Sequence, residues 1–411
     1  MAAVCKFGQT ICNRLLKSLM KHSQQLERGR NHIVAVLRSG YPEQRNILHA
    51  TSIGFIHVFA KDYVSFLEKL WHRLSGNSYS KFLHSFSMPV KVPVGVIHTF
   101  NSIVFSRLSW VVTFETTLPR ESHMPPLFIR LAWRRLADER CLSVVALSEC
   151  ARQRLLDDLK LNQAGLAQDQ LELIRGKVTL LHPPQSVLVE FEDKVKAVDF
   201  DGSLKLALIG HDFYRKGGLE VLLALDVLLD EGLDVQLNIA GKMAAGDYAS
   251  RAGESEVAKA EALIEKHSSQ INLMGSQPST EVLALLRRSH IVCLPTWGET
   301  YGYSVLEGQA SGCAAITTDI RALPEINNNE CGWVIQVPKL ANEDGDLGTS
   351  EKRDHFRKVL VSGLILAFRE AHDDRIQLRN KARASLERIR CDHDPEMHAA
   401  RLSEIYSKGT K

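Results

Sequence analysis

Short apolar runs alternate with longer helical patterns through the second half of the chain, and this alternation most narrowly limits the fold. The runs are rich in Val, Ile and Leu and are apolar at every position rather than at every second one. Strands of that kind are buried on both faces, which is typical of a parallel sheet covered by helices. The expected strands are 204–209, 235–240, 271–274, 291–294, 314–317 and 333–337.

The first half repeats this pattern less clearly, with expected strands at 47–50, 94–99, 110–114, 142–147 and 178–181. Pro183-Pro184 ends the last of these, and a mixed acidic stretch leads to the next strand. Two α/β domains are therefore expected, and parallel sheets bind ligands at the carboxyl ends of their strands. The expected segments are a basic N-terminal extension at 1–45, a first domain at 46–195, a second domain at 196–390 and a C-terminal helix at 391–411.

Composition and charge exclude several classes of protein. The 411 residues carry 51 Lys and Arg against 48 Asp and Glu, a net charge of +3, so we expect no nucleic-acid partner. The eight cysteines form no C-x2-C pair, and no apolar stretch approaches the ~20 residues that span a bilayer. We expect a cytoplasmic protein. Residues 10–22 would form an amphipathic basic helix, which either docks peripherally on the inner membrane face or packs on its own domain.

The residues with the clearest chemistry lie at 295–312, which read PTWGETYGYSVLEGQASG. A strand runs into a glycine-containing loop and then into a helix, so Glu299 and Glu307 flank a helix N-terminus. Helix N-termini expose unpaired N–H groups and a positive dipole end, which suit a phosphate or sugar hydroxyls. Taken alone, each Glu is better interpreted as a solvated loop or helix charge, and only the two together with the glycines favour a binding site.

This segment resembles the Glu-x7-Glu signature of retaining glycosyltransferases with the GT-B fold. The family is large, is known as family four or "glycosyl transferases group one", and includes sucrose and glycogen synthases. A second motif is similar: the family's strand ends in Gly-Arg, followed by Lys-Gly, and this chain has Gly210-His211 followed by Arg215-Lys216-Gly217. The resemblance is specific from about residue 204 to 337, and His211 departs from it.

The resemblance implies an α/β GT-B architecture, in which two Rossmann-like domains face a central cleft and the last helix crosses back to the first domain. It implies a hexosyl-type enzyme that moves a sugar from a UDP- or GDP-linked donor to an acceptor hydroxyl. The acceptor would be a carbohydrate or glycolipid, in surface polysaccharide assembly. Lys216, Arg215 and Glu299 would be catalytic, with Arg215 supplying the charge missing at His211. The donor-binding residues would be Gly217, Gly302, Tyr303, Ser304 and Glu307.

In the first domain the resemblance is weaker. His98 and Glu115 are expected at strand ends that face the cleft, and Glu115 stands where the family usually has a histidine. Gly54 is expected in a loop that meets the diphosphate. The alternative for His98 and Glu115 is a polar group already satisfied within the fold.

No metal and no cofactor are expected, because Lys, Arg and a helix dipole can neutralise a diphosphate. Two other functions fit the same residues. One is a catalytically silent GT-B protein that serves as a carbohydrate-binding or partner subunit. The other is a sugar-nucleotide epimerase, which would release an altered nucleotide sugar without any acceptor.

Overall fold

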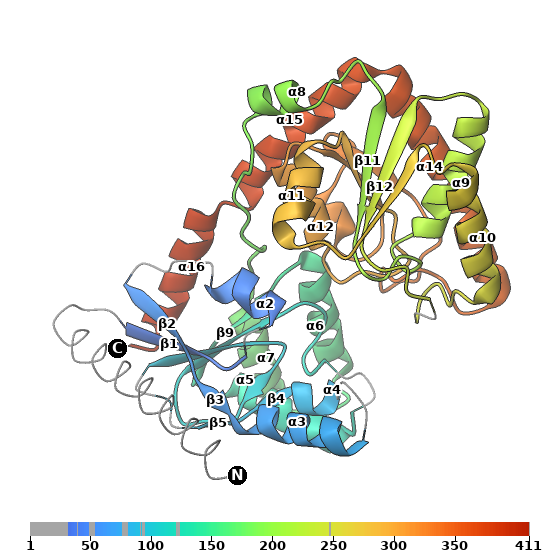
Figure 1. Cartoon of the computed structure of the whole chain (residues 1–411). Helices are drawn as coiled ribbons and strands as arrows, with labels where there is room; N and C mark the ends of the chain where they lie inside the picture. The colour runs from blue at the N-terminus through green and yellow to red at the C-terminus, as the bar shows by residue number, and fades with distance from the viewer. Residues whose placement is uncertain are drawn as a thin grey trace, which may run out of the picture.

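The computed structural model describes residues 32–38, 40–48, 54–75, 81–90, 92, 95–120, 124–245 and 248–410. These residues form two α/β domains, and Figure 1 shows the first in blue to green and the second in green through yellow to red. Each domain is built on one six-stranded sheet whose neighbouring strands are all parallel. The basic helix expected at residues 10–22 lies outside the described residues.

The first sheet has the strand order β10-β9-β8-β6-β1-β2. Its strands are β1 (His32–Val36), β2 (Phe55–Phe59), β6 (Val96–Phe100), β8 (Trp110–Phe114), β9 (Cys141–Ala146) and β10 (Val178–Leu180). Two short pairs lie beside it, β3 (Lys61–Asp62) with β5 (Pro89–Val90) and β4 (Phe86–Ser87) with β7 (Ile103–Val104).

Two expectations for this domain are wrong. The strand expected at 47–50 is absent from its described part, because residues 44–48 form a π-helical turn, η1 (Gln44–Leu48). The strand β1 lies inside the segment that was expected to be an extension. The apolar run of β1 takes an internal place between β2 and β6. Ile47 instead packs as a fully buried side chain beside Val36 and Phe100.

Helices cover both faces of the first sheet. The domain's helices are α2 (Tyr41–Glu43), α3 (Tyr63–Ser75), α4 (Lys81–His84), α5 (Pro126–Ala137), α6 (Glu149–Leu161) and α7 (Gln168–Lys177). On one face, side chains of α5, α6 and α7 pack into a cluster with alternate strand residues such as Ala35, Ile97 and Val112.

The opposite face is covered from far along the sequence. The helix α16 (Pro395–Ser407) descends from the second domain to the first, as Figure 1 shows in red. Its Leu402, Ile405 and Tyr406 pack on Val34 and Val96 of the first sheet. Strand residues alternate between the two faces, so β1 contributes to both layers at once. The C-terminal helix therefore completes the core of the first domain.

The second sheet has the strand order β13-β12-β11-β14-β15-β16. The six strands expected from the sequence are confirmed, with each end within two residues of its expected place. They are β11 (Leu204–Ile209), β12 (Val235–Ala240), β13 (Ile271–Gly275), β14 (Ile291–Leu294), β15 (Ala314–Thr318) and β16 (Gly332–Ile335).

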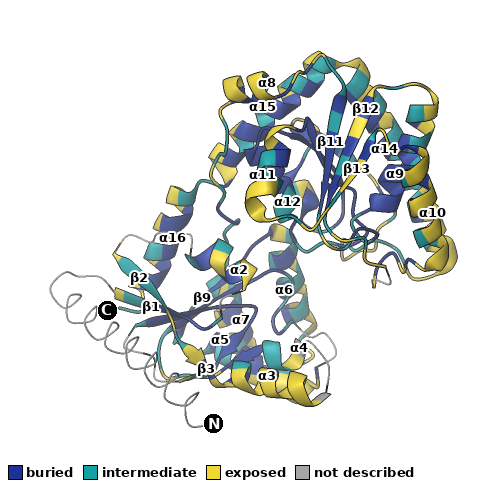
Figure 2. Ribbon diagram, in the orientation of Figure 1, coloured by how far each residue is buried: buried dark blue, intermediate teal, exposed yellow. Residues whose placement is uncertain are grey.

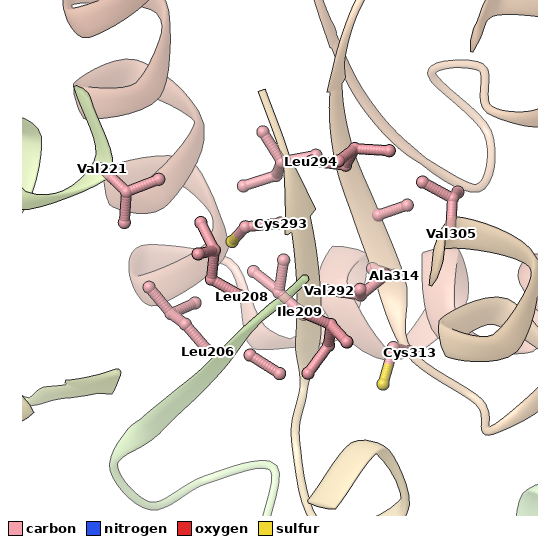
Figure 3. Close-up of a cluster of buried hydrophobic side chains, with 14 of the residues drawn as sticks. Leu206, Leu208, Ile209, Val221, Val292, Cys293, Leu294, Val305, Cys313 and Ala314 are labelled. Carbon is pink, nitrogen blue, oxygen red and sulfur yellow. The ribbon is translucent and has the colours of Figure 1, made fainter. Parts of the chain in front are cut away.

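Apolar side chains fill both sides of this sheet. Figure 3 shows Leu208 of β11 and Leu294 of β14 in the middle, with Val221 and Val305 approaching from helices on opposite sides. Figure 2 shows the central strands of this sheet largely buried, whereas the edge strand β13 is partly exposed. The helices are α8 (Phe191–Ala197), α9 (Gly218–Asp230), α10 (Glu254–Lys266), α11 (Ser279–Arg287), α12 (Tyr303–Ala310), α13 (Leu323–Ile326), α14 (Ser350–Asp373) and α15 (Arg375–Asp392). Within the described ranges, no helix is long and apolar enough to cross a membrane.

Replacing Leu402 with Ala should destabilise the first domain by about 2–5 kcal/mol, because it removes a fully buried side chain from the layer between α16 and the sheet. The measurement is urea unfolding followed through the transition of the first domain. The matched control is Met397→Ala on the same helix, where the side chain is 67% exposed and the expected change is within about 0.5 kcal/mol. Equal effects of the two substitutions would contradict this account of α16.

Candidate functional site

The strand order of the second sheet places its binding edge between β11 and β14. The chain runs outward from β11 in one direction and from β14 in the other, so loops that follow these two strands leave the sheet on opposite sides. The crevice between such loops, at the carboxyl ends of the strands, is where parallel sheets bind ligands. Gly210 follows β11 directly, and Pro295 follows β14.

Two glycines allow the loop after β11 to lie against the loop after β14. Gly210 has φ +141°, and a Cβ atom there would lie 2.3 Å from the Cε atom of Lys216. Gly217 has φ +80°, and a Cβ atom there would lie 2.0 Å from the backbone oxygen of Pro295. Any larger residue at either position would displace Lys216 or separate the loops. The glycines thereby fix where the lysine side chain can reach.

The Lys216 side chain reaches Glu299. Its Nζ atom donates a hydrogen bond of 3.0 Å to Oε2 of Glu299. Arg215 lies behind this pair, with a guanidinium nitrogen 3.7 Å from the same carboxylate oxygen. Asp212 and the backbone oxygen of Gly298 both accept hydrogen bonds from Arg215 and hold it in place. The structure thus brings together the three residues predicted to be catalytic, whereas His211 is exposed to solvent.

The Glu299 carboxyl group is ionised at neutral pH. Burial by itself would raise its pKa, but the charges of Lys216 and Arg215 and the hydrogen bond from Lys216 outweigh this, so the pKa lies below its ordinary value of 4.5. Only 15% of the side chain is exposed. An ionised carboxylate only accepts hydrogen bonds, and one with a lowered pKa is a weak base. The chemistry of Glu299 is therefore that of an acceptor for hydroxyl groups.

The helix α12 begins beside this ion pair. Gly302, at its N-cap, has φ +109°, and Tyr303 and Ser304 form the first turn, whose N–H groups have no partner within the helix. Among the described residues, the hydroxyl of Ser304 is buried without a hydrogen-bond partner. The start of α12 therefore offers donors and a positive dipole end next to Lys216 and Glu299.

Glu307, on the same helix, makes contact with the first domain. Its Oε1 atom accepts hydrogen bonds from the hydroxyl of Tyr41 at 2.9 Å and from the guanidinium of Arg45 at 2.8 Å. The guanidinium also lies over the ring of Tyr303, 4.8 Å from its centre. The amide of Asn46 donates to the hydroxyl of Tyr303 at 2.8 Å. The helical segment after β1, formed by α2 and η1, thus contacts the α12 side of the site.

Two further contacts join the domains. The carboxylate of Glu325 accepts hydrogen bonds from the backbone N–H groups of Glu149, at 2.6 Å, and Cys150, at 2.8 Å. These groups belong to the first turn of α6, whose dipole favours a negative charge there. Arg154 pairs with Asp344 at 2.6 Å. The two domains therefore also meet through the charged groups of Glu325, Arg154 and Asp344.

Glu115 lies at the carboxyl end of β8, on the edge of the first sheet that faces the second domain. Arg120 pairs with it at 2.8 Å, and the amide of Asn101 donates to it at 3.1 Å. Burial raises the pKa of the Tyr303 hydroxyl, and the charge of Glu115 raises it further. This places Glu115 near Tyr303, although its Oε1 atom is held by Arg120 and Asn101 within the first domain.

His98 and Gly54 are not in the cleft. His98 is fully buried in the middle of β6, between the hydroxyls of Thr113, at 2.8 Å, and Tyr406, at 2.6 Å. Its ring is used to join the sheet to α16. Gly54 precedes β2, and its backbone oxygen accepts from His32 at the start of β1, so it lies at the amino ends of the strands. Both predictions are corrected: the glycine after β1 at the cleft edge is Gly40.

Sequence reasoning missed the first-domain residues that reach α12, which are Tyr41, Arg45 and Asn46. The signal was present in residues 32–40, HIVAVLRSG, where an apolar run leads into a serine and a glycine. That pattern is typical of a strand followed by a ligand-binding loop. The excess of basic residues around it led to the prediction of an extension.

One group of metal-ligand type lies away from the site. The ligand atoms of Asp226, Asp230 and His267 lie within 4.8 Å of one another on α9 and at the end of α10. The amine of Lys266 donates to both carboxylates at 2.7 Å and so offsets part of their charge.

Comparisons with known proteins agree with this architecture. Residues 190–343 match the family described as "Glycosyl transferases group 1". A glycogen synthase of Mycobacterium tuberculosis is 28% identical over 207 residues, which is 50% of this chain and 42% of that protein. The chain thus matches less than half the length of this curated relative. The range that matches the glycosyltransferase family, residues 190–343, contains all six strands of the second sheet.

Solved structures match nearly the whole chain. A glycosyltransferase from Rickettsia africae has a TM-score of 0.56 and 15% identity, covering 93% of this chain and 99% of its own. The Anabaena protein Alr3699/HepE, solved in complex with UDP, has a TM-score of 0.56 and 11% identity, covering 92% and 99%. The expected GT-B fold, with two parallel-sheet domains, is confirmed.

The lowered pKa of Glu299 predicts a pH-dependent stability difference between the wild type and Glu299→Gln. The ionised carboxylate stabilises the folded state fully above about pH 4.5, the unfolded value, and the contribution is lost as the pH falls through the lower folded pKa. The variant should therefore melt at a lower temperature than the wild type at pH 7, and this difference should shrink as the pH falls below about 4.5. Calorimetry from pH 3 to pH 7 measures it. A constant difference across that range would mean that Lys216 does not hold the carboxylate ionised.

Proposed function

We propose that this protein transfers a sugar from a nucleotide diphosphate sugar to an acceptor hydroxyl. The observation that carries the proposal is the ion pair between Lys216 and Glu299 beside the start of α12. It lies at the carboxyl edge of a domain that matches a glycosyltransferase family. One side of this site offers positive charge for a diphosphate, and the other offers a carboxylate for sugar hydroxyls.

Lys216 would stabilise the negative charge that develops on the departing diphosphate. Preorganised cations at the position where charge develops are usually the largest single contribution to such a reaction. Arg215 adds a second cation nearby, and the N–H groups of Tyr303 and Ser304 add donors at a helix N-terminus. These groups provide the neutralisation that a divalent ion would provide elsewhere, so we propose a reaction without a dedicated metal or cofactor.

Glu299 would orient the donor sugar and would not exchange a proton. Its low pKa keeps it ionised and makes it a poor base. We therefore propose that the acceptor oxygen attacks the anomeric carbon from the face that the diphosphate leaves. The bond from that carbon to the diphosphate oxygen breaks, and the acceptor proton passes to the departing phosphate oxygen. This sequence retains the anomeric configuration.

Glu307 would hold the ribose of the nucleotide. In the structure its carboxylate is held by Tyr41 and Arg45, so ribose hydroxyls would have to share or replace these contacts. The Glu307 side chain is 21% exposed, so ribose hydroxyls could reach it and take the place of these contacts. Donor binding and the contact between the domains are thus coupled through this one carboxylate.

The proposed donor and acceptor classes rest on the similarity of this chain to known glycosyltransferases. HepE binds UDP in its crystal structure, and the curated relative is a glycogen synthase. We propose a UDP- or GDP-linked hexose as donor and a carbohydrate or glycolipid as acceptor, with a role in surface polysaccharide or glycolipid assembly.

The second candidate function is a catalytically silent GT-B subunit that binds carbohydrate. Two observations favour it: His211 is exposed at the position of the family's arginine, and Glu307 is already held by the first domain. The two functions differ in turnover, because only the enzyme consumes its donor. An epimerase would also consume the donor, but it would release an altered nucleotide sugar without any acceptor.

Replacing Lys216 with Ala should lower the rate of donor turnover by about 10²–10³-fold, because a charge that faces the leaving group is lost. The assay follows the release of nucleoside diphosphate from UDP- and GDP-sugars, with and without added acceptor. Lys259→Ala, on the exposed side of α10, is the matched control and should turn over like the wild type. Turnover of the Lys216 variant near the wild-type rate would remove its assigned role.

Nucleoside diphosphates should raise the melting temperature of the wild type, since a ligand that binds only the folded state stabilises it. Glu307→Gln should reduce this shift by lowering affinity for the ribose, while Glu265→Gln on α10 should leave it unchanged. Differential scanning fluorimetry with UDP and GDP measures the shift and identifies the base. If neither nucleotide shifts the wild type, the proposed donor class is wrong.

A further inference from the structure

The helix α3 turns its apolar side outward. Its large apolar residues recur at helical spacing on one side, and each is between 37% and 78% exposed: Tyr63, Phe66, Leu67, Leu70, Trp71 and Leu74. On the surface of a globular domain, such a stripe normally faces the core and the polar side faces water. Here the arrangement is reversed, and Val64 is the buried apolar residue of the helix.

The exposed apolar surface extends beyond α3. Phe82 of α4 contacts Phe128 of α5 with ring centres 5.0 Å apart, which joins the three helices into one surface. Figure 2 shows α3 as a largely exposed helix at the base of the first domain. Of the 23 large apolar residues exposed in the described chain, thirteen form what we call the α3 face. They are Phe59, Tyr63, Phe66, Leu67, Leu70, Trp71, Leu74, Phe82, Met88, Val90, Leu127, Phe128 and Leu131.

The exposed charges that the structure describes around the α3 face are positive. Between residues 54 and 137, none of the described Asp and Glu residues is exposed. Asp62 is buried and accepts from backbone N–H groups of α3, and Glu68 pairs with Arg38 at 3.1 Å. The exposed charged residues of the same range are basic: Lys61, Lys69, Arg73, Arg107, Arg130 and Arg134.

We infer that the α3 face docks on an anionic lipid surface. Membrane-surface helices combine an apolar side with flanking Lys and Arg, and their aromatic residues lie at the level of the headgroups. Each basic residue near an anionic bilayer contributes about 1 kcal/mol of attraction. The charge of the α3 face matches acidic headgroups, and its exposed aliphatic and aromatic side chains match the acyl boundary below them.

A second copy of the chain fits this face less well. In a twofold contact the same surface meets itself, so the basic residues of one copy would approach those of the other. The described part of the face has no exposed carboxylate to pair with them. The inference is independent of the proposed transfer reaction, because it uses neither Lys216 nor Glu299.

Co-sedimentation of the full chain with vesicles tests the inference. The wild type should bind vesicles of phosphatidylcholine with phosphatidylglycerol, and bind more weakly to phosphatidylcholine alone or at high salt. The variant Phe66→Ser/Leu70→Ser/Leu74→Ser should lower affinity by about tenfold or more, because it removes apolar area that docking on the membrane would bury. The matched control is Leu366→Ser/Ile376→Ser, at positions 65% and 77% exposed in the second domain, which should bind like the wild type.

A charge variant and a measurement of particle size distinguish lipid docking from self-association. Lys69→Glu/Arg73→Glu should also weaken binding to the anionic vesicles. The inference is overturned if the wild type does not bind these vesicles, or if the triple serine variant binds them as well as the wild type. It is also overturned if Lys17→Glu/Lys21→Glu alone abolishes binding. Light scattering that shows a wild-type dimer, lost in the triple serine variant, would assign the face to a second copy instead.

Discussion

A buried carboxylate stays charged only when cations lie beside it. In the second domain, Lys216 and Arg215 are the cations that lie beside Glu299. Without Lys216 and Arg215, burial would favour the neutral acid. The lysine reaches the carboxylate because Gly210 leaves space for its side chain and Gly217 lets its loop touch the loop after β14. The electrostatics of the site therefore depend on two positions that carry no side chain at all.

Polar contacts supplement an apolar contact between the domains, because Val36, Ile47 and Phe100 of the first domain belong to the same buried cluster as the core of the second domain. Glu307 with Arg45 and Arg154 with Asp344 are ion pairs whose side chains are between 13% and 27% exposed. Partly exposed pairs of this kind contribute about 1 kcal/mol or less each. Ion pairs of this strength can break and re-form if the domains move during a reaction cycle, as lid and domain closures do in many enzymes.

The second domain could be predicted closely from the sequence because its strands are apolar on both faces and are separated by clear turns. The first domain could be predicted only in part. Its strand β1 is short and is surrounded by basic residues, so the apolar run did not indicate a strand. His98 has the chemistry of a site residue, but its ring contacts α16 inside the core. The pairing of Arg45 with Glu307 joins residues 262 positions apart, and no local pattern shows it.

The order in which the chain is made has a consequence for the layer formed by α16. Translation produces all six strands of the first sheet before residues 395–407 exist, so Val34, Val96, Val111 and Val145 emerge from the ribosome without the cover they have in the native state. An uncovered apolar sheet face promotes association with other chains. The first domain is thus expected to stay partly folded, and to need protection by chaperones, until the second domain has been synthesised.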